Sequence, residues 1–239
     1  MTTSFYAPLE NIRDQAYVVL PDDEAAHAAR VLRKQAGDEI IVVDGEGGWY
    51  RVRLDQVGKR KASGVIVEAR REVGEPGYSL RIGLALLKNR NRFETFLEKA
   101  VEMGVSEVVP LLTQRTEKAS LKAQRTHNLL VAAMKQCGRS RLMRVTKPTV
   151  FGEALTETSS DTKLIAHEAV DPAHGLLPIL SREQAQSCFM LIGPEGGFTE
   201  EEIEVAQQAG FTPISLGPRR LRAETAALVA ASAMMLIAT

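Results

Sequence analysis

The chain contains 239 residues, enough for one large domain or two small ones. Its 30 basic residues balance its 30 acidic residues, so the overall charge does not indicate a nucleic-acid partner. The two cysteines, Cys137 and Cys188, lie far apart and outside any metal-binding spacing, which argues against a disulfide framework and against a zinc site.

No segment of the sequence indicates a membrane span or an export signal. The N-terminus lacks a basic stretch followed by an apolar one, and the most apolar run, 226–238, is too short to cross a bilayer. Hydrophobic residues make up 44% of the chain, which is ordinary for a globular protein. We therefore expect a cytoplasmic globular protein without a bound metal.

The first part of the chain is expected to form mostly short β-strands. The predicted strands are Tyr17–Leu20, Glu39–Val43, Trp49–Val57 and Gly64–Glu68. A short helix is expected over Asp22–Lys34. Several short strands in so small a segment favour a β-barrel.

Three cations, Arg30, Arg33 and Lys34, lie near the end of the predicted helix. Cations are favoured at a helix C-terminus by the macrodipole, which explains them without any ligand. The alternative is a patch that contacts phosphate groups. The sequence leaves both interpretations open.

A boundary between domains is indicated by Glu72–Tyr78, which contains two glycines and a proline. We place the first domain at residues 1–73 and the second at 74–239. After the boundary, predicted strands alternate with predicted helices, beginning with the apolar strand Leu80–Leu87. This alternation is typical of an α/β domain built on a parallel sheet.

Basic residues are concentrated in one part of the second domain. Residues 113–149 contain nine Lys or Arg and one acid, Glu117, whereas residues 153–171 contain five acids and one lysine. A charge run of this kind can be a solvated face, but a nucleic-acid surface is favoured here. Together with the basic loop 88–92, the candidate contacts are Lys88, Arg90, Arg92, Arg115, Arg125, Arg139 and Arg141.

The last quarter of the chain repeats one pattern twice. The apolar runs Phe189–Ile192 and Pro213–Leu216 each end in a Gly-Pro turn that opens a helix. This pattern leaves glycine backbone and helix N-termini at the carboxyl ends of strands, where open α/β sheets bind ligands. Thr199 and Glu202 are spaced as a capping box at the start of the first helix, so we expect Gly193–Gly197 to be a fixed loop.

The final helix has small and apolar residues on every face from Ala226 to Ala238. A helix that is apolar all round is buried all round. At a chain terminus this favours burial against a second subunit, and burial within the chain is the alternative.

The two glycine-containing segments, Ile192–Phe198 and Leu216–Ala227, resemble the cofactor-binding loops of the RsmE family. These are SPOUT-superfamily methyltransferases that make 3-methyluridine in small-subunit (16S) ribosomal RNA. Phe93–Thr116 resembles the first segment of the family's knotted domain, Gln136–Arg139 its mid-domain turn, and His27–Gly48 its N-terminal domain.

The resemblance extends over nearly the whole chain and implies an architecture. It implies a PUA-like RNA-binding β-barrel at 1–73 and a SPOUT methyltransferase domain at 74–239, which is α/β and trefoil-knotted. It also favours a homodimer that acts on small-subunit ribosomal RNA. General topology argues against knots, so the knot follows from the resemblance alone.

The cofactor that the resemblance implies is S-adenosylmethionine, held by the two loops through backbone groups and apolar contacts. The implied cofactor-binding residues are Leu191, Ile192, Gly193, Glu195, Gly196, Gly197, Leu216, Gly217, Leu221 and Arg222. The RNA contacts would be the cations of the second domain named above together with Arg30, Arg33 and Lys34.

Three residues are candidates for the chemistry. Glu195 and Glu224 are candidate acid–base or orienting groups, although a carboxylate in the first turn of a helix, as at Glu224, is also favoured by the macrodipole alone. Arg222, which matches the family's Leu-Arg-x-Glu-Thr pattern, is the candidate for charge stabilisation. A structural salt bridge from Arg222 to either glutamate is the alternative.

Two other classes of function remain open. One is a related SPOUT enzyme that methylates a ribose 2′-hydroxyl of tRNA. The other is a non-catalytic RNA-binding protein on the same fold, which would bind RNA without affinity for the cofactor.

Overall fold

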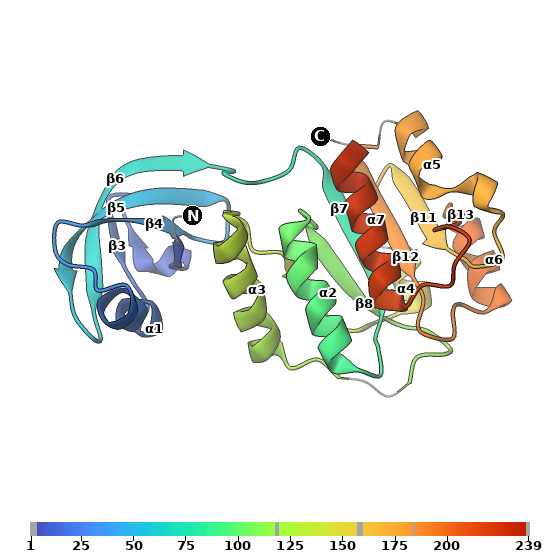
Figure 1. Ribbon diagram of the computed structural model, residues 1–239, viewed down its shortest axis with the longest axis horizontal. Helices are drawn as coiled ribbons and strands as arrows, with labels where there is room; N and C mark the ends of the chain where they lie inside the picture. The colour runs from blue at the N-terminus through green and yellow to red at the C-terminus, as the bar shows by residue number, and fades with distance from the viewer. Residues whose placement is uncertain (1–3, 118–119, 157–159, 184, 238–239) are drawn as a thin grey trace. The chain divides into compact units, whose positions relative to one another are not determined.

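The computed structural model describes residues 4–117, 120–156, 160–183 and 185–237. The chain divides into two compact units. Unit 1 comprises Met1–Glu75 and Leu130–Leu142, and unit 2 comprises Pro76–Leu129 and Met143–Thr239. Each unit contains its own sheet, as the ribbon shows (Figure 1). The predicted fold class, a segment formed mostly of β-strands followed by an α/β segment, is confirmed.

The sheet of unit 1 has six strands in the order β1-β4-β5-β6-β3-β2. Their bounds are β1 Ser4–Tyr6, β2 Ile12–Arg13, β3 Tyr17–Val19, β4 Glu39–Val43, β5 Gly48–Val57 and β6 Ala62–Arg71. On β5, Tyr50, Val52 and Leu54 are buried while Arg51 and Arg53 between them are exposed. This period of two places one face of the sheet on the core of unit 1.

The sheet of unit 1 is curled but open. Its order is linear, and the edge strands β1 and β2 do not pair with each other among the described residues. The helix predicted over Asp22–Lys34 is shorter than expected: α1, Asp22–Ala26, continues as a single π-helical turn, His27–Val31. Arg33 has a φ of +51°, and this left-handed backbone ends the helix before Lys34.

Residues Leu130–Leu142 belong to unit 1, although the sequence places all of 74–239 in one domain. The side chain of Ser4 donates a hydrogen bond to the carbonyl of Lys135, at 3.0 Å. The Lys135 ammonium pairs with the buried carboxylate of Glu24. The periodicity of the sequence identifies a helix in this region. It does not show that the second half of this helix packs against the sheet of unit 1. A single domain boundary near residue 74 therefore could not separate the two units.

The sheet of unit 2 is entirely parallel. Its order is β10-β8-β7-β12-β11-β13, with β9 paired to β8. The bounds are β7 Ser79–Ala85, β8 Glu107–Leu112, β9 Arg144–Val145, β10 Thr149–Val150, β11 Thr162–Ala166, β12 Ser187–Ile192 and β13 Thr212–Ile214. Parallel strands bring all their carboxyl ends to one edge, which is the edge where the predicted glycine loops lie. The trefoil knot stays a prediction.

Helices lie on both faces of this sheet, as a parallel sheet requires. The helices of the chain beyond α1 are α2 Arg90–Glu102, α3 Ala123–Cys137, α4 Phe151–Thr156, α5 Leu176–Glu183, α6 Glu200–Gln208 and α7 Ala223–Ile237. Helix α7 packs on α2, α5, β7 and β12. Residues of α4 and α6 share a core with Phe189 and Leu191, which point to one face of β12. The short helices α4 and α5 and the two-residue strands have no clear sequence signal.

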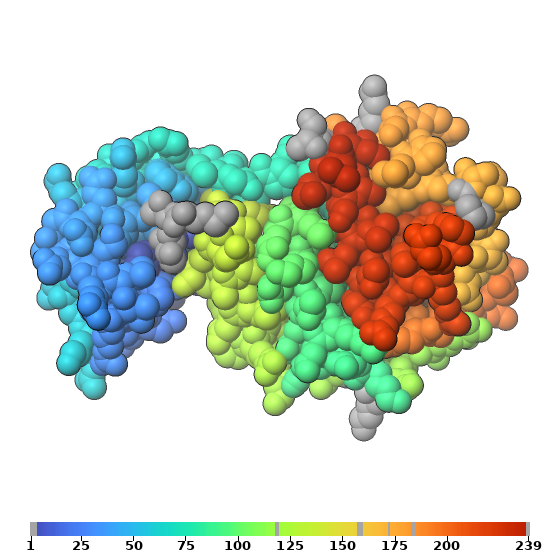
Figure 2. Space-filling model, viewed as in Figure 1, coloured from blue at the N-terminus to red at the C-terminus, as the bar shows by residue number. Residues whose placement is uncertain are grey.

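Helix α7 is buried mainly within its own chain. Ala227, Ala230, Ala231 and Met234 have no exposed surface, and Figure 2 shows the red surface of α7 between green α2 and orange α5. Leu236 remains 72% exposed. The intrachain alternative therefore accounts for most of the apolar surface of this helix. No helix among the described residues is long and apolar enough to cross a membrane.

Candidate active site

A cavity of about 580 Å³ lies at the carboxyl edge of the unit 2 sheet. Residues at the ends of three neighbouring strands, β11, β12 and β13, form its floor, beginning with Ala166, Ile192 and Ser215. The two predicted glycine loops form its walls. This volume lies within the range of small-molecule and cofactor sites, roughly 300–1,000 Å³.

The first loop, Gly193–Phe198, is held from both ends. The amide of Gly197 donates to the carbonyl of Pro194 at 2.9 Å, and the Phe198 ring is buried in the core. A Cβ on Gly193 would lie 3.1 Å from the backbone nitrogen of Phe198, so the turn leaves no room for a side chain there. The predicted fixed loop is confirmed.

The helix that follows the first loop, α6, has the predicted cap. Thr199 accepts from the amide of Glu202, and Glu202 accepts from the amide of Thr199, which is a complete capping box. The pKa of Glu201 is held below its usual range, mainly by a hydrogen bond from its own backbone N–H. These contacts fix the direction in which the first loop enters the helix.

The second loop, which follows β13, is joined to the first by an arginine. Gly217 has a φ of +108°, a backbone conformation that side chains other than glycine rarely adopt, and its amide donates to the Ser215 hydroxyl. Arg220 donates to the backbone carbonyl of Glu195 at 3.3 Å and lies 3.8 Å from Glu168. The cavity is thus closed on two sides by segments that contact each other.

Most of the predicted cofactor-binding residues line this cavity. They are Ile192, Gly193, Glu195, Gly197, Leu216, Gly217 and Leu221. Leu191, Gly196 and Arg222 are not among its lining residues in the described part of the chain. The Leu191 side chain points into the core, because alternate residues of a strand face opposite sides of the sheet, so a contact from Leu191 to the cofactor would have to come from its backbone.

The three catalytic candidates are placed differently. Glu195 is exposed and lines the cavity. Glu224 lies in the first turn of α7, where its carboxylate is 3.6 Å from Arg92 and its Oε2 has no hydrogen-bond partner among the described atoms. Arg222 is exposed, immediately before α7, and pairs with no acid of the described residues, so the alternative of a structural salt bridge to Glu195 or Glu224 is not observed there.

Several lining residues were not identified from the sequence. His167 and Glu168 follow β11, and His167 Nε2 lies 3.8 Å from a carboxylate oxygen of Glu200. The sequence contains the signal, because the apolar residues Leu164 and Ile165 predict a strand over Lys163–His167, and the carboxyl end of a parallel strand reaches the same edge as the glycine loops. Arg115 follows the carboxyl end of β8 and reaches the cavity by the same rule, although the sequence analysis assigned it to RNA contact only.

Arg115 holds the first loop in the described structure. Its Nη1 donates to the carbonyl of Gly196 at 2.5 Å and to that of Phe198 at 3.3 Å. A Cβ on Gly196 would lie 3.3 Å from the Arg115 side chain. Arg115 was predicted to contact RNA, and these two hydrogen bonds give it a structural function beside the cavity.

The other predicted RNA-binding cations of unit 2 are exposed or half-buried and paired with acids. Lys88 lies 3.0 Å from Glu117, and a hydrogen bond to that carboxylate raises the pKa of Lys88. Arg90 and Arg125 both contact Glu94, at 3.5 and 2.7 Å. Arg92 pairs with Glu224 as described above. Pairing of this kind leaves the cations accessible at the surface.

In unit 1 the predicted cations fall into two groups. Arg30 and Arg33 are exposed, Lys34 lies 3.4 Å from the carbonyl of Glu39, and Arg141 forms an exposed pair with Glu72. Arg139 differs from all of these.

Arg139 is buried, and its prediction as an RNA contact is wrong. Its side chain is 6% exposed, and its Nε and Nη2 both bond to Glu75, whose side chain is 8% exposed. The other oxygen of Glu75 accepts from the amides of Ser140 and Arg141. A guanidinium with this burial cannot reach a phosphate, so it serves the packing of Leu130–Leu142 in unit 1.

Two protein families match the chain. An RNA methyltransferase domain matches residues 75–235, and an RNA methyltransferase PUA domain matches residues 20–67. The fold and the cavity therefore define an RNA methyltransferase with an N-terminal PUA-like domain.

Individual relatives agree over the full length. Ribosomal RNA small subunit methyltransferase E of Synechocystis sp. is 33% identical over 221 residues, covering 90% of this chain and 72% of the relative. A probable rRNA-methyltransferase from Porphyromonas gingivalis, solved as a crystal structure, is 33% identical with a TM-score of 0.85, covering 99% of this chain and 98% of the relative. The chain belongs to the RsmE family.

A third relative bears on the cofactor. The crystal structure of ribosomal RNA small subunit methyltransferase E from Neisseria gonorrhoeae, bound to S-adenosyl methionine, has a TM-score of 0.84 and 30% sequence identity. The match covers 99% of this chain and 98% of that one.

The neighbouring arginines 139 and 141 allow a matched test of burial. Arg139→Ala leaves the buried Glu75 carboxylate without its ion partner, so the free energy of unfolding should fall by about 3–5 kcal/mol. Arg141→Ala breaks an exposed pair and should cost less than about 1 kcal/mol. Urea unfolding of both variants measures the difference, and equal losses would contradict the assignment of Arg139 to the core.

Proposed function

We propose that this protein transfers the methyl group of S-adenosylmethionine to N3 of a specific uridine in small-subunit (16S) ribosomal RNA. The observation that carries the proposal is the cavity closed by the two glycine loops, in a chain of the RsmE family. Its residues suit the cofactor. Ile192, Leu216 and Leu221 offer apolar surface, and the glycines of the two loops, Gly193, Gly197 and Gly217, offer backbone that no side chain of their own covers.

The cofactor when bound supplies an activated methyl group, and the remaining requirements fall on this chain. Uridine N3 carries a proton and is engaged in base pairing within a duplex, so the target base must be unpaired or splayed out. When the N3 proton leaves, negative charge spreads over O2 and O4 of the uracil, and this charge is consumed as N3 takes the methyl group and the methyl–sulfur bond of the cofactor breaks.

We assign these tasks to the catalytic candidates. Glu195 lines the cavity and is exposed, which suits a group that accepts or orients the N3 proton. Arg222 lies between Leu221 and Ala223, two lining residues, and its charge is not consumed by an acid of the described chain. It would stabilise the charge on the uracil oxygens. Glu224 would act as an orienting group, through its pair with Arg92.

The predicted RNA contacts other than Arg139 remain part of this proposal. Arg30, Arg33, Lys34 and Arg141 would contact the RNA from unit 1. In unit 2, Lys88, Arg90, Arg92 and Arg125 keep exposed or half-buried side chains that a phosphate can approach. Arg115 would act at the rim of the cavity. We further propose that the protein works in the cytoplasm.

Product analysis decides between this function and its alternatives. Nucleoside mass spectrometry of ribosomal RNA from cells lacking the gene should show loss of 3-methyluridine, restored by the wild-type gene. A change in 2′-O-methylated tRNA nucleosides would instead favour a ribose methyltransferase. Unchanged nucleosides, together with RNA binding but no affinity for S-adenosylmethionine, would favour a non-catalytic RNA-binding protein.

Arg222 tests the assignment of charge stabilisation. Arg222→Ala should slow methyl transfer at least tenfold, which corresponds to about 1.4 kcal/mol of transition-state stabilisation. Arg222→Lys should not restore the full rate, because a point charge does not replace a planar guanidinium. Initial rates with small-subunit RNA measure both variants.

Arg182→Ala is the matched control, since Arg182 is exposed on α5 and pairs with no acid of the described chain. Circular dichroism checks that each variant is folded. A near-normal rate in folded Arg222→Ala protein would remove Arg222 from the catalytic set.

We also propose that the protein is a homodimer that uses α7. Val229 and Leu236 are 38% and 72% exposed and lie seven residues apart, on one face of the helix. Light scattering at micromolar concentration should give twice the monomer mass, and Leu236→Glu should reduce it by placing a charge in the interface. A monomer in the wild-type protein would contradict the proposal.

A further inference from the structure

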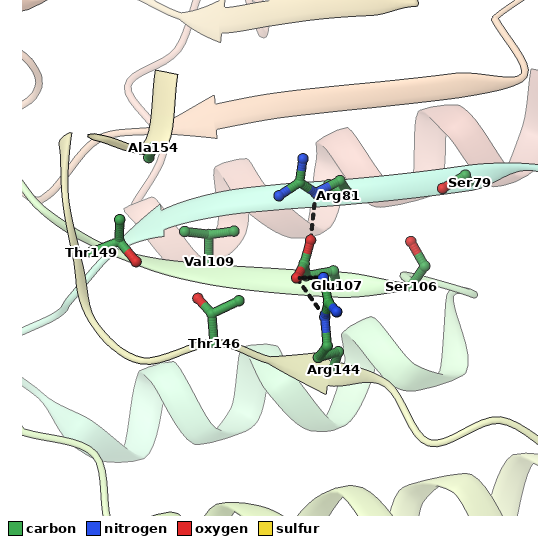
Figure 3. Close-up of a pocket in the computed structure, with 9 residues that line it drawn as sticks. All are labelled: Ser79, Arg81, Ser106, Glu107, Val109, Arg144, Thr146, Thr149 and Ala154. Atoms are coloured by element: carbon green, nitrogen blue, oxygen red, sulfur yellow. Dashed lines mark hydrogen bonds and ion pairs between the residues drawn. The ribbon is translucent and has the colours of Figure 1, made fainter. Parts of the chain in front are cut away.

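A second cavity, of about 440 Å³, opens beside the first residues of β7 and β8. It shares no lining residue with the cofactor cavity in the described part of the chain. Figure 3 shows its centre, where Arg81 and Arg144 approach Glu107 from opposite sides. Arg144 belongs to the basic tract 113–149, whereas Arg81 and Glu107 were not among the residues predicted for the cofactor site or for RNA contact.

The three charged residues form a row across three parallel strands. Arg81 on β7 is the register partner of Glu107 on β8, and Glu107 is that of Arg144 on β9. Arg81 Nε lies 2.5 Å from one oxygen of the Glu107 carboxylate, and Arg144 Nε lies 2.7 Å from the other. The row therefore carries two positive charges and one negative charge.

Both guanidinium groups of the row are hydrogen-bonded to Glu107, and the three residues differ in exposure. Glu107 is 5% exposed. The Arg81 guanidinium lies 4.7 Å from the centre of the Phe189 ring, over its face, which is a favourable cation–π contact. The Arg144 side chain is 75% exposed, so its charge faces the solvent side of the cavity.

Stability alone does not account for this row. The same face of the sheet is covered by an apolar core that includes Val109 and Phe189, and Phe189 is the register partner of Arg81. Burying a carboxylate is costly, and apolar residues in its place commonly serve stability as well or better. One arginine would suffice to pair with Glu107, and an ion pair as exposed as that of Arg144 adds little stability.

The charged donors that line the cavity are those of the two arginines. The hydroxyls of Thr146 and Thr149 donate to the carbonyl of Lys147, and that of Ser106 donates to the carbonyl of Leu80. These hydroxyls are therefore already committed as donors. A guanidinium presents a planar set of N–H groups that matches phosphate oxygens, and positions fixed in advance lower the entropic cost of binding.

We propose that the Arg81–Glu107–Arg144 row binds a phosphate group of the RNA backbone, at a nucleotide other than the one that is methylated. The inference rests on the proposed function in taking RNA as the substrate. Glu107 fixes the two guanidinium groups and reduces their joint charge to one, so that a single phosphodiester neutralises the row.

Salt dependence tests this directly. Binding of a fluorescein-labelled single-stranded RNA oligonucleotide is measured by anisotropy in a salt series, and the logarithm of the association constant is plotted against that of the salt concentration. Arg144→Ala should make the slope shallower by about 0.7, the value for one phosphate of a single strand, which weakens binding about fivefold at ~0.1 M salt. Arg144→Lys should keep the wild-type slope.

A control variant and a variant that should strengthen RNA binding complete the experiment. Arg182→Ala removes an exposed cation of the same unit and should leave the slope unchanged. Glu107→Gln removes the negative charge of the row and should tighten RNA binding in protein that melts cooperatively. If Glu107→Gln does not fold, the comparison of Arg144→Ala with Arg182→Ala decides alone.

Two results would overturn the proposal. The first is the same slope for Arg144→Ala and Arg182→Ala. In the second, inorganic phosphate raises the melting temperature of the wild-type protein, and this effect is lost in Arg144→Ala although RNA binding is retained. That result would identify a site for free phosphate. Affinity for S-adenosylmethionine is measured separately in every variant. Failure of the wild-type protein to bind that cofactor would count against the proposed function and not against this site.

Discussion

The carboxylate of Glu202 is the contact on which the candidate active site depends. Its two oxygens accept from the amides of Thr199 and Gln114, each at 2.9 Å, and its own amide donates to the Thr199 hydroxyl. Glu202 is 5% exposed, so these bonds form away from competing water. Hydrogen bonds to a charged group contribute about 1.5–3 kcal/mol each. One side chain thus joins the start of α6 to the loop that follows β8.

The position of Arg115 follows from that junction. Because the amide of Gln114 is fixed by Glu202, the next residue is placed where its guanidinium reaches the carbonyls of Gly196 and Phe198. The first glycine loop is therefore held by α6 on one side and by the β8 loop on the other. Arg220 then joins the second loop to the first, so the geometry of the cavity depends on contacts that are distant in the sequence.

Local signals in the sequence predicted local structure well. The sequence predicted the capping box at Thr199, the fixed loop at Gly193–Gly197 and the bounds of β4, because each of these depends only on residues that are close together in the chain. The alternation of residues along a strand also indicates that the Leu191 side chain points into the core. The prediction of the cofactor contacts did not use this alternation. The family resemblance supplied what periodicity could not, namely the chemistry of the cavity.

Long-range pairing is where prediction from the sequence failed. Arg139 lies in a basic tract beside Arg141, and only the position of Glu75, distant in the sequence, distinguishes a buried cation from an exposed one. The same holds for the arginines around Glu107, whose register across three strands is a property of the sheet. A count of basic residues along the chain therefore overestimates the number of cations that can contact RNA, because some of them, such as Arg139, are buried in an ion pair with an acid. It also does not show that a sheet gathers distant cations, such as Arg81 and Arg144, into one row.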